Sequence, residues 1–304
     1  MTLQDMPRTE LASRLRGAGV TLRCGALLMR IGSSLPELVD PIARLYGDYR
    51  LADGNELPDF AAGVEPVPRW RSPLRPTATA VVDGRAAFDP FPRSQALPMF
   101  EWILNWCVFT RPNTYLLLHS AVIERGGDGL LLSGTAGAGK STLTTALVFR
   151  GWRLLSDEVA MIPPGRRALL PLPRPIGLKN ASIEIVRREC ASAVLGPSTE
   201  DTRKGTVAHV KPPTESVARA DEPARPRWIV FPRFEAGVTA EVRPVSRADA
   251  LLRLGDQAFN YSMLGAVGFD ALATVVEDCA CFDVRFGNLD DALACVEHVT
   301  EAAV

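Results

Sequence analysis

Apolar runs with short polar interruptions predict the elements of the first third of the chain. Residues 20–31 (VTLRCGALLMRI) predict one strand, and residues 35–46 predict a short helix that Pro41 interrupts. An Asp-Gly pair at 83–84, between two short strand-like runs, is typical of a hairpin turn. Residues 53–76 carry five prolines, which predicts an irregular connector.

The middle of the chain alternates between helix-like and strand-like patterns. Residues 95–109 are a strongly apolar helical run, and strand-like runs follow at 115–124, 130–133 and 152–156. We expect a helix before the last of these strands, because a glycine-rich loop precedes it and Gly151 ends it.

One segment in the last third of the chain differs in composition from its surroundings. Residues 197–226 contain five prolines and ten charged residues, which favours a mobile excursion or lid over a core element. Around it, hydrophobic periodicity predicts helices at 181–189, 246–254, 270–280 and 289–301 and strands at 227–231, 239–243 and 282–286.

Helices and strands are intermixed throughout, which predicts the α/β class. With 304 residues, the chain is long enough for one large domain or two modest ones. We expect an α+β extension over residues 1–94, packed on a mixed-sheet core domain over residues 95–304.

Composition excludes several function classes. Hydrophobic residues make up 47% of the chain and charged residues 23%, which is typical of a folded protein rather than a disordered one. The formal net charge of −1 provides no positive field, so we expect no nucleic-acid partner. The first residues lack a signal-like apolar region and no stretch approaches 18 apolar residues. We therefore expect a cytoplasmic protein without a membrane partner. Homo-oligomerisation stays open.

The six cysteines do not form a metal-binding pattern. They contain no CxxC pair, and the histidines have no ligand spacing to them. We therefore expect reduced thiols in the core.

A glycine-rich phosphate loop is the strongest functional motif. Residues 134–141 (GTAGAGKS) match G-x-x-x-x-G-K-[ST] after an apolar strand and before a helix. Glycines let backbone N–H groups surround phosphate oxygens, Lys140 brings charge to the β- and γ-phosphates, and Ser141 offers a hydroxyl to Mg²⁺. The motif predicts a site for ATP and Mg²⁺ made by Gly134, Thr135, Ala136, Gly137, Ala138, Gly139, Lys140, Ser141 and Thr142.

Two acids, Asp157 and Glu158, end the strand that follows this helix. The helix descends about 16 Å and the strand climbs back about 16 Å, which returns the acids to the level of the phosphate loop. Ligands bind at this edge of open α/β sheets. We expect the pair to hold Mg²⁺ with Ser141 and to accept a proton from an attacking hydroxyl. The alternative is a pair of acids that caps the strand or faces solvent.

His119 is a further candidate. If the turn centres on residues 126–127, paired residues have numbers that sum to about 253, and His119 lies opposite Gly134. It would then bond a phosphate or orient a carboxylate, unless a one-residue slip turns it to the other face as an ordinary core histidine. The antiparallel strand before the loop also argues against a Rossmann or RecA-like core.

The run from His119 to Glu158 resembles the C-terminal kinase domain of HPr kinase/phosphorylase. Histidine, hairpin, phosphate loop, helix, Arg-Gly and two acids follow in that family's order without a gap. The resemblance is specific over 115–163, weaker to about 290, and absent over 1–94. The whole chain is more similar to the divergent HPr-kinase-related proteins than to the sugar-regulation enzyme.

The resemblance implies a fold related to phosphoenolpyruvate carboxykinase and transfer of the ATP γ-phosphate to a serine of a partner protein or peptide. It places Asp157 as the catalytic base, Glu158 as the metal-associated acid and His119 beside the site, with Lys140 neutralising charge on the moving group.

The chain also departs from the family's pattern. Glu158 stands where the family has a second Asp, and Thr142 replaces an acidic residue that helps to hold the metal. The later Glu and Arg-Gly-x-Gly signature has no clear counterpart, residues 185–188 (IVRR) being at most a remnant. We therefore expect a kinase without efficient phosphorylase activity.

Four other residues are secondary candidates: Arg174, Lys179, Lys204 and His209. The cations would neutralise charge on the transferred group if they reach the site, and each is equally compatible with an ordinary surface loop. Besides a protein serine kinase, a small-molecule kinase of the same superfold and a catalytically degenerate ATP-binding module remain open.

Overall fold

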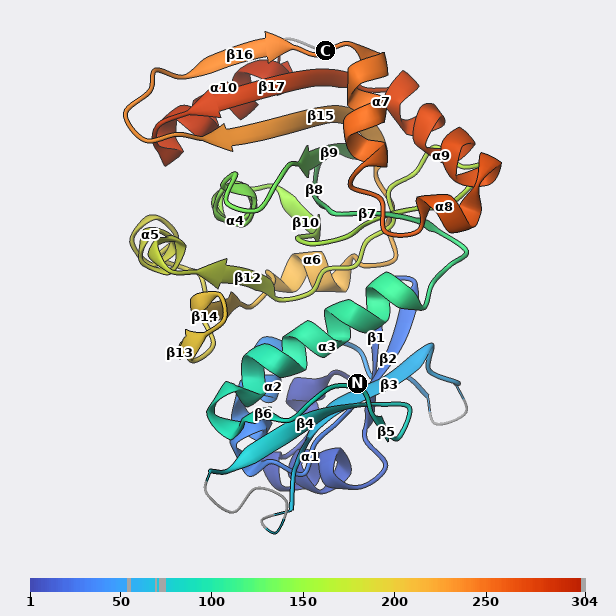
Figure 1. Ribbon diagram of the computed structural model, residues 1–304, viewed down its shortest axis with the longest axis vertical. Helices are drawn as coiled ribbons and strands as arrows, with labels where there is room; N and C mark the ends of the chain where they lie inside the picture. Colours follow the sequence, from blue (N-terminus) through green and yellow to red (C-terminus); the bar gives the residue numbers. More distant parts are fainter. Residues whose placement is uncertain (54–55, 69, 71–74, 302–304) are drawn as a thin grey trace.

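Two β-sheets, with a long helix between them, account for most of the fold (Figure 1). The computed structural model describes residues 1–53, 56–68, 70 and 75–301. In the N-terminal sheet the order is β1-β2-β3-β4-β5, with β6 also paired to β4. Strands β2 and β3 run parallel and the other pairs antiparallel. Its strands are β1 (Val20–Cys24), β2 (Leu27–Gly32), β3 (Phe60–Pro66), β4 (Thr77–Val82), β5 (Arg85–Ala86) and β6 (Phe91–Pro92).

Helices α1 (Arg8–Arg16), α2 (Val39–Leu45) and α3 (Ala96–Thr110) pack with this sheet, and 3₁₀ turns occur at Leu3–Asp5, Pro36–Leu38 and Arg93–Gln95. The helix over 95–109, which is α3, is predicted from the sequence to belong to the core domain over residues 95–304. Its buried residues, among them Phe100 and Ile103, belong to the same hydrophobic cluster as β1 to β4. Helix α3 thus packs on the N-terminal sheet and forms the N-terminal layer together with residues 1–94. It lies between the two sheets (Figure 1).

The second sheet has the order β10-β8-β9-β15-β17-β16. Strands β9, β15 and β17 run parallel, and the flanking strands run antiparallel to their neighbours. Its members are β8 (Ser120–Arg125), β9 (Asp128–Ser133), β10 (Arg153–Ser156), β15 (Arg225–Phe234), β16 (Glu241–Pro244) and β17 (Ala280–Phe286). The expected mixed α/β architecture is confirmed, and the hairpin has the predicted register, since Ser120 pairs with Ser133.

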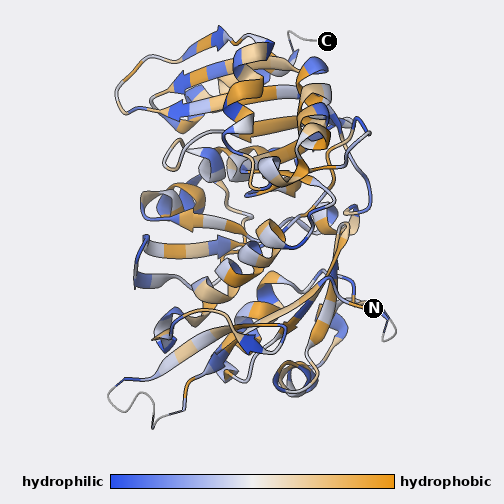
Figure 2. Ribbon diagram, turned by 45° about the vertical axis from the view of Figure 1, so that its right-hand side comes forward, coloured by the Kyte–Doolittle hydropathy of each residue, from blue (hydrophilic) through white to orange (hydrophobic). Residues whose placement is uncertain are grey.

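Alternation along these strands builds a core on each face of the sheet. On β15, Trp228 and Val230 join one cluster, whereas Ile229 and Phe231 join the other. The first cluster includes α4 (Lys140–Val148), α5 (Ala181–Glu189) and α10 (Leu289–Glu301), and the second includes α7 (Arg247–Gly255) and α9 (Ala266–Glu277), with α8 (Tyr261–Leu264) beside α9. Apolar residues, orange in Figure 2, are accordingly concentrated in the strands of this sheet. Within the described ranges, no helix combines the length and apolar character that crossing a bilayer requires.

The expectation that residues 197–226 contain no core element is wrong. The segment forms β13 (Thr199–Thr202), β14 (Gly205–Val210) and α6 (Thr214–Ala218), and β12 (Ile176–Lys179) completes a sheet of order β12-β14-β13. Val207, Ala208 and Val210 are buried in it. The prolines and charges that suggested a loop lie around this short apolar run.

Other boundaries also differ from expectation. The strand predicted at 20–31 is a hairpin, because Gly25 adopts a left-handed φ of +55° where the chain turns. The connector predicted at 53–76 contains β3, while 54–55, 69 and 71–74 lie outside the described residues. Pro41 does not interrupt α2, because it falls within the first turn of that helix. The predicted hairpin at 83–84, the helix over 95–109 and the helix over 181–189 are confirmed.

A buried ion pair links the two layers. Arg174, just before β12, bonds to the Glu101 carboxylate of α3 at 2.9 Å, and both side chains are at most 7% exposed. The Tyr46 hydroxyl donates to the same carboxylate, and Tyr49 donates to the carbonyl of Pro173. The segment that leads into β12 is therefore held by the N-terminal layer.

We expect Arg174→Met to lower the free energy of unfolding by about 3–5 kcal/mol, because it leaves the Glu101 carboxylate buried without its cation. The double variant Arg174→Met, Glu101→Gln should recover part of that loss, since the amide still accepts the Tyr46 hydroxyl. Urea unfolding of the three proteins measures this. Equal destabilisation by the single and double variants would contradict a charge-based cost.

Candidate active site

The phosphate loop connects β9 to α4, as the motif predicts. Gly137 and Gly139 adopt left-handed φ values of +87° and +90°, which only glycine adopts without strain. A Cβ on Gly139 would lie 3.1 Å from Cζ of Phe286, so the bare backbone lets that ring pack against the loop. Lys140 donates from Nζ to the carbonyls of Gly134 and Thr135, the latter at 3.2 Å, and so lies over the loop. The N-terminus of α4 lies at this loop, and the first N–H groups of a helix are suited to binding an anion.

Asp157 lies against the first turn of α4. The Ser141 hydroxyl donates to Asp157 Oδ2 at 3.1 Å, so the loop and the acid predicted to face it are in contact. The side chain is 5% exposed, and within the described part of the chain its Oδ1 has no hydrogen-bond partner. Burial, and next the Glu158 carboxylate, raise the pKa of Asp157 to about 7, against the lowering influence of the Ser141 hydroxyl, the Gly177 backbone N–H and Lys140.

Glu158 and His119 meet where two neighbouring strands are interrupted. Strand β8 pairs with β10, and their continuations β7 (Leu116–Leu118) and β11 (Ala160–Ile162) pair in a separate ladder. Between the two ladders His119 Nε2 lies 3.3 Å from Glu158 Oε2. Burial would raise the pKa of Glu158, but the hydrogen bond and charge of His119 outweigh it and lower the value, with further help from Lys179 and Lys204.

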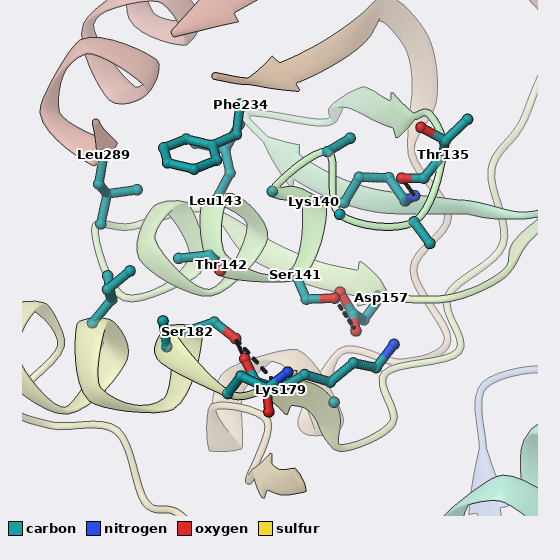
Figure 3. Close-up of a pocket in the computed structure, with 18 of the residues that line it drawn as sticks. Thr135, Lys140, Ser141, Thr142, Leu143, Asp157, Lys179, Ser182, Phe234 and Leu289 are labelled. Atoms are coloured by element: carbon teal, nitrogen blue, oxygen red, sulfur yellow. Dashed lines mark hydrogen bonds between the residues drawn. The ribbon is translucent and has the colours of Figure 1, made fainter. Parts of the chain in front are cut away.

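These residues line one cavity of about 410 Å³, a size typical of small-molecule sites. Phe234 and Leu289 lie at an apolar end, and Lys140, Asp157 and Lys179 lie at the other (Figure 3). Phe286 also lines the cavity, with its ring 6.0 Å from the Phe234 ring. Every residue predicted at the phosphate loop except Gly134 lines this cavity, together with His119 and both acids.

The secondary candidates divide. Lys179 lines the cavity, whereas Arg174 is buried in the ion pair with Glu101. His209 is buried opposite Gly177 in the β12–β14 ladder, where desolvation lowers its pKa. Arg174, Lys204 and His209 do not line the cavity.

Sequence reasoning missed the apolar end. Phe234 and Phe286 are the last residues of β15 and β17 and pair with each other in the parallel ladder. Because ligands bind at the carboxyl ends of parallel strands, the ends of strands beside β9 were the signal that could have found them.

The oxygen atoms at the polar end fit Mg²⁺ in kind. The Ser141 hydroxyl and the Asp157 carboxylate are adjacent, and the unpartnered Asp157 Oδ1 has capacity to bind. Within the described ranges no group of three or more His, Cys, Asp or Glu side chains could hold a metal by itself. A cation here would therefore need further oxygens from phosphate or water.

Comparisons with known proteins do not assign the chain to a family. No protein-family model and no curated protein matches the chain. Among solved structures, the Hpr(Ser) kinase/phosphatase from Coxiella burnetii is similar at 13% sequence identity and a TM-score of 0.28, over 61% of this chain and 98% of that chain. A TM-score this low carries no argument about activity, so the function has to be inferred from the residues of this chain.

The raised pKa of Asp157 predicts a pH-dependent stability. In the unfolded chain the group titrates near 3.8 and in the folded protein near 7, so the folded protein binds the extra proton between these values. The contribution of Asp157 to the free energy of unfolding is therefore fully present below about pH 4 and is lost as the pH rises through 7. Asp157→Asn should therefore stabilise the free protein by about 2–4 kcal/mol at pH 8, with the gain disappearing toward pH 4.

Chemical unfolding of the wild type and Asp157→Asn between pH 4 and 8 tests this. The matched control is Asp270→Asn on the exposed surface of α9, which should give a difference that does not change with pH. A flat difference for Asp157→Asn would contradict the raised pKa.

Proposed function

We propose that this protein is an ATP-dependent kinase that transfers the γ-phosphate to a serine hydroxyl of a partner protein or peptide, without efficient phosphorylase activity. The observation that carries the proposal is the hydrogen bond between Ser141 and Asp157. It puts a phosphate-binding loop and a buried, unusually basic carboxylate within reach of one ligand.

The two ends of the cavity suit the two parts of ATP. Phe234, Phe286 and Leu289 offer apolar surface to the base, and the phosphate loop takes the phosphates at the other end. Lys140 would exchange its contacts with loop carbonyls for phosphate oxygens.

Ser141, Asp157 and Glu158 would hold Mg²⁺. When bound, the ion neutralises phosphate charge and fixes the orientation of the triphosphate. A nearby cation lowers the pKa of a carboxyl, and the burial of Asp157 beside Glu158 counteracts that loss of basicity.

Asp157 is the proposed general base. A pKa near 7 suits a group that must be unprotonated before reaction and accept a proton during it. The carboxylate oxygen of Asp157 that does not contact Mg²⁺ would receive the serine proton. His119 holds Glu158 in its charged form, so the two acids have different protonation behaviour.

The exposed surface beside His119 favours a macromolecular acceptor. The ring of Phe259 lies 5.8 Å from the His119 ring, and Phe259, Met263, Val267 and Phe269 are all at least 40% exposed. Phe259 thus lies beside the site, and exposed apolar residues of this kind on α8 and α9 are typical of protein contacts. Arg187 and Arg188 pair with glutamates of α5 and do not line the cavity.

Two substitutions separate catalysis from binding. Asp157→Asn should keep ATP affinity within about twofold and reduce phosphoryl transfer about 10³-fold, because the amide oxygen can still contact the cation but no longer accepts the serine proton. Lys140→Ala should weaken ATP binding about 10- to 100-fold through the lost charge-assisted bonds. Calorimetric titration and the release of ADP measure the two quantities. Unchanged transfer by Asp157→Asn would refute its role as base, and ATP binding without any turnover in the wild type would favour the binding module.

The acceptor can be identified with the same variant. Phosphoserine sites present in cells that express the wild type should be absent in cells that express Asp157→Asn. A phosphorylated metabolite in place of these sites would instead identify a small-molecule kinase.

Met263→Gln tests the apolar surface. Met263 is 69% exposed, so the variant should change stability by less than about 0.5 kcal/mol. We expect kcat/KM for the protein acceptor to fall about tenfold while ATP hydrolysis in its absence is unchanged. The control is Val194→Gln, a 46% exposed position in the loop after α5. Equal effects of the two variants on the acceptor reaction would argue against a contact at α8.

A further inference from the structure

Lys179 enters the cavity from the wall opposite the phosphate loop. It is the last residue of β12, and its side chain extends below Ser141 and Asp157 (Figure 3). Among the described residues no carboxylate lies within ion-pair distance of Lys179 or of Lys204, whereas Lys211, a third lysine of this region, pairs with Asp48.

Asn180 holds the second cation near the first. Its N–H donates to the Thr206 carbonyl at 2.9 Å, its Oδ1 accepts the Thr206 N–H at 3.0 Å, and its Nδ2 donates to the Lys204 carbonyl at 3.3 Å. Asn180 itself adopts a left-handed φ of +51°, which costs conformational energy that these bonds offset. The turn between β13 and β14 is thereby fixed against the end of β12.

The two lysines raise the positive potential near the acids. Burial, and next the charge of Lys179, lower the pKa of Lys204, while Glu158 opposes that shift. Two cations held together without an ion-pair partner repel each other, and an anion bound between them would remove that repulsion. The phosphate loop provides a cation only on the other side, through Lys140.

We propose that Lys179, supported by Lys204, binds the γ-phosphoryl group of the nucleotide from the side opposite the phosphate loop and stays in contact with it during transfer. This rests on the proposed kinase function. The bond between the γ-phosphorus and the β,γ-bridging oxygen breaks, and ADP leaves with the electron pair. The bond to the serine oxygen forms, and the serine proton passes to Asp157. Charge then develops on the oxygens between Lys140 and Lys179, where two opposed cations stabilise it best.

The test compares the affinities for ATP and ADP, which differ only in the γ-phosphate. In Lys179→Met we expect Mg-ATP binding to weaken about tenfold and Mg-ADP binding to change less than about twofold. ATP hydrolysis with water as acceptor should fall about 100-fold. Lys179→Arg, which keeps the charge, should recover most of the ATP affinity. Lys204→Met should show the same selectivity with a smaller loss.

Arg203→Gln is the matched control, since it removes the neighbouring cation of the same turn. Neither Arg203 nor Lys204 is part of the cavity lining, but Lys204 lowers the pKa of Glu158. Arg203→Gln should leave both affinities unchanged. Equal losses of ATP and ADP affinity in Lys179→Met, or no loss of either, would overturn the γ-phosphoryl contact. In both cases a wild type that binds and hydrolyses ATP would leave the kinase proposal standing. A wild type that binds neither nucleotide would overturn both.

Discussion

The candidate site depends on the point where the β8–β10 ladder ends and the β7–β11 ladder begins. In a continuous ladder, the side chains at this point would alternate between the two faces of one sheet, and their backbone groups would be hydrogen-bonded to the neighbouring strand. The interruption instead brings His119 and Glu158 into contact and leaves Asp157 beside Ser141. One break in pairing therefore sets the positions of all three titratable residues relative to the phosphate loop.

Burying Asp157 opposes stability and raises the basicity of its carboxylate. A carboxylate that is 5% exposed, has one unpartnered oxygen and lies next to Glu158 is costly in its charged form, which is why its pKa rises to about 7. The same features make it a stronger base than an exposed aspartate. The sheet around it compensates through two apolar cores, one on each face.

The N-terminal layer and the site are joined through the segment before β12. Arg174 and the Pro173 carbonyl are anchored by Glu101 and Tyr49 of the N-terminal layer, and five residues after Arg174 the chain reaches Lys179 in the cavity. Arg174 is thus buried in an ion pair and Lys179 faces the cavity, a distinction that spacing in the sequence could not draw. Residues 1–94 and α3 therefore act on the cavity indirectly, by holding the strand that carries Lys179.

The sequence alone determined the local features. The glycine spacing at 134–141 requires a loop with left-handed backbone, and the hairpin turn at 126–127 fixes the register of β8 against β9 because only short-range pairing is involved. It also placed Asp157 near Ser141, since one helix and one strand return the chain to the same edge. The tertiary structure decided which contacts form between segments that are far apart in the chain. The contact of His119 with Glu158, the apolar end formed by Phe234 and Phe286, and the place of Val207 and Val210 in a buried strand depend on pairing between segments far apart in the chain. Local periodicity cannot encode such pairing, because it depends on which surfaces meet once the sheets and helices have packed.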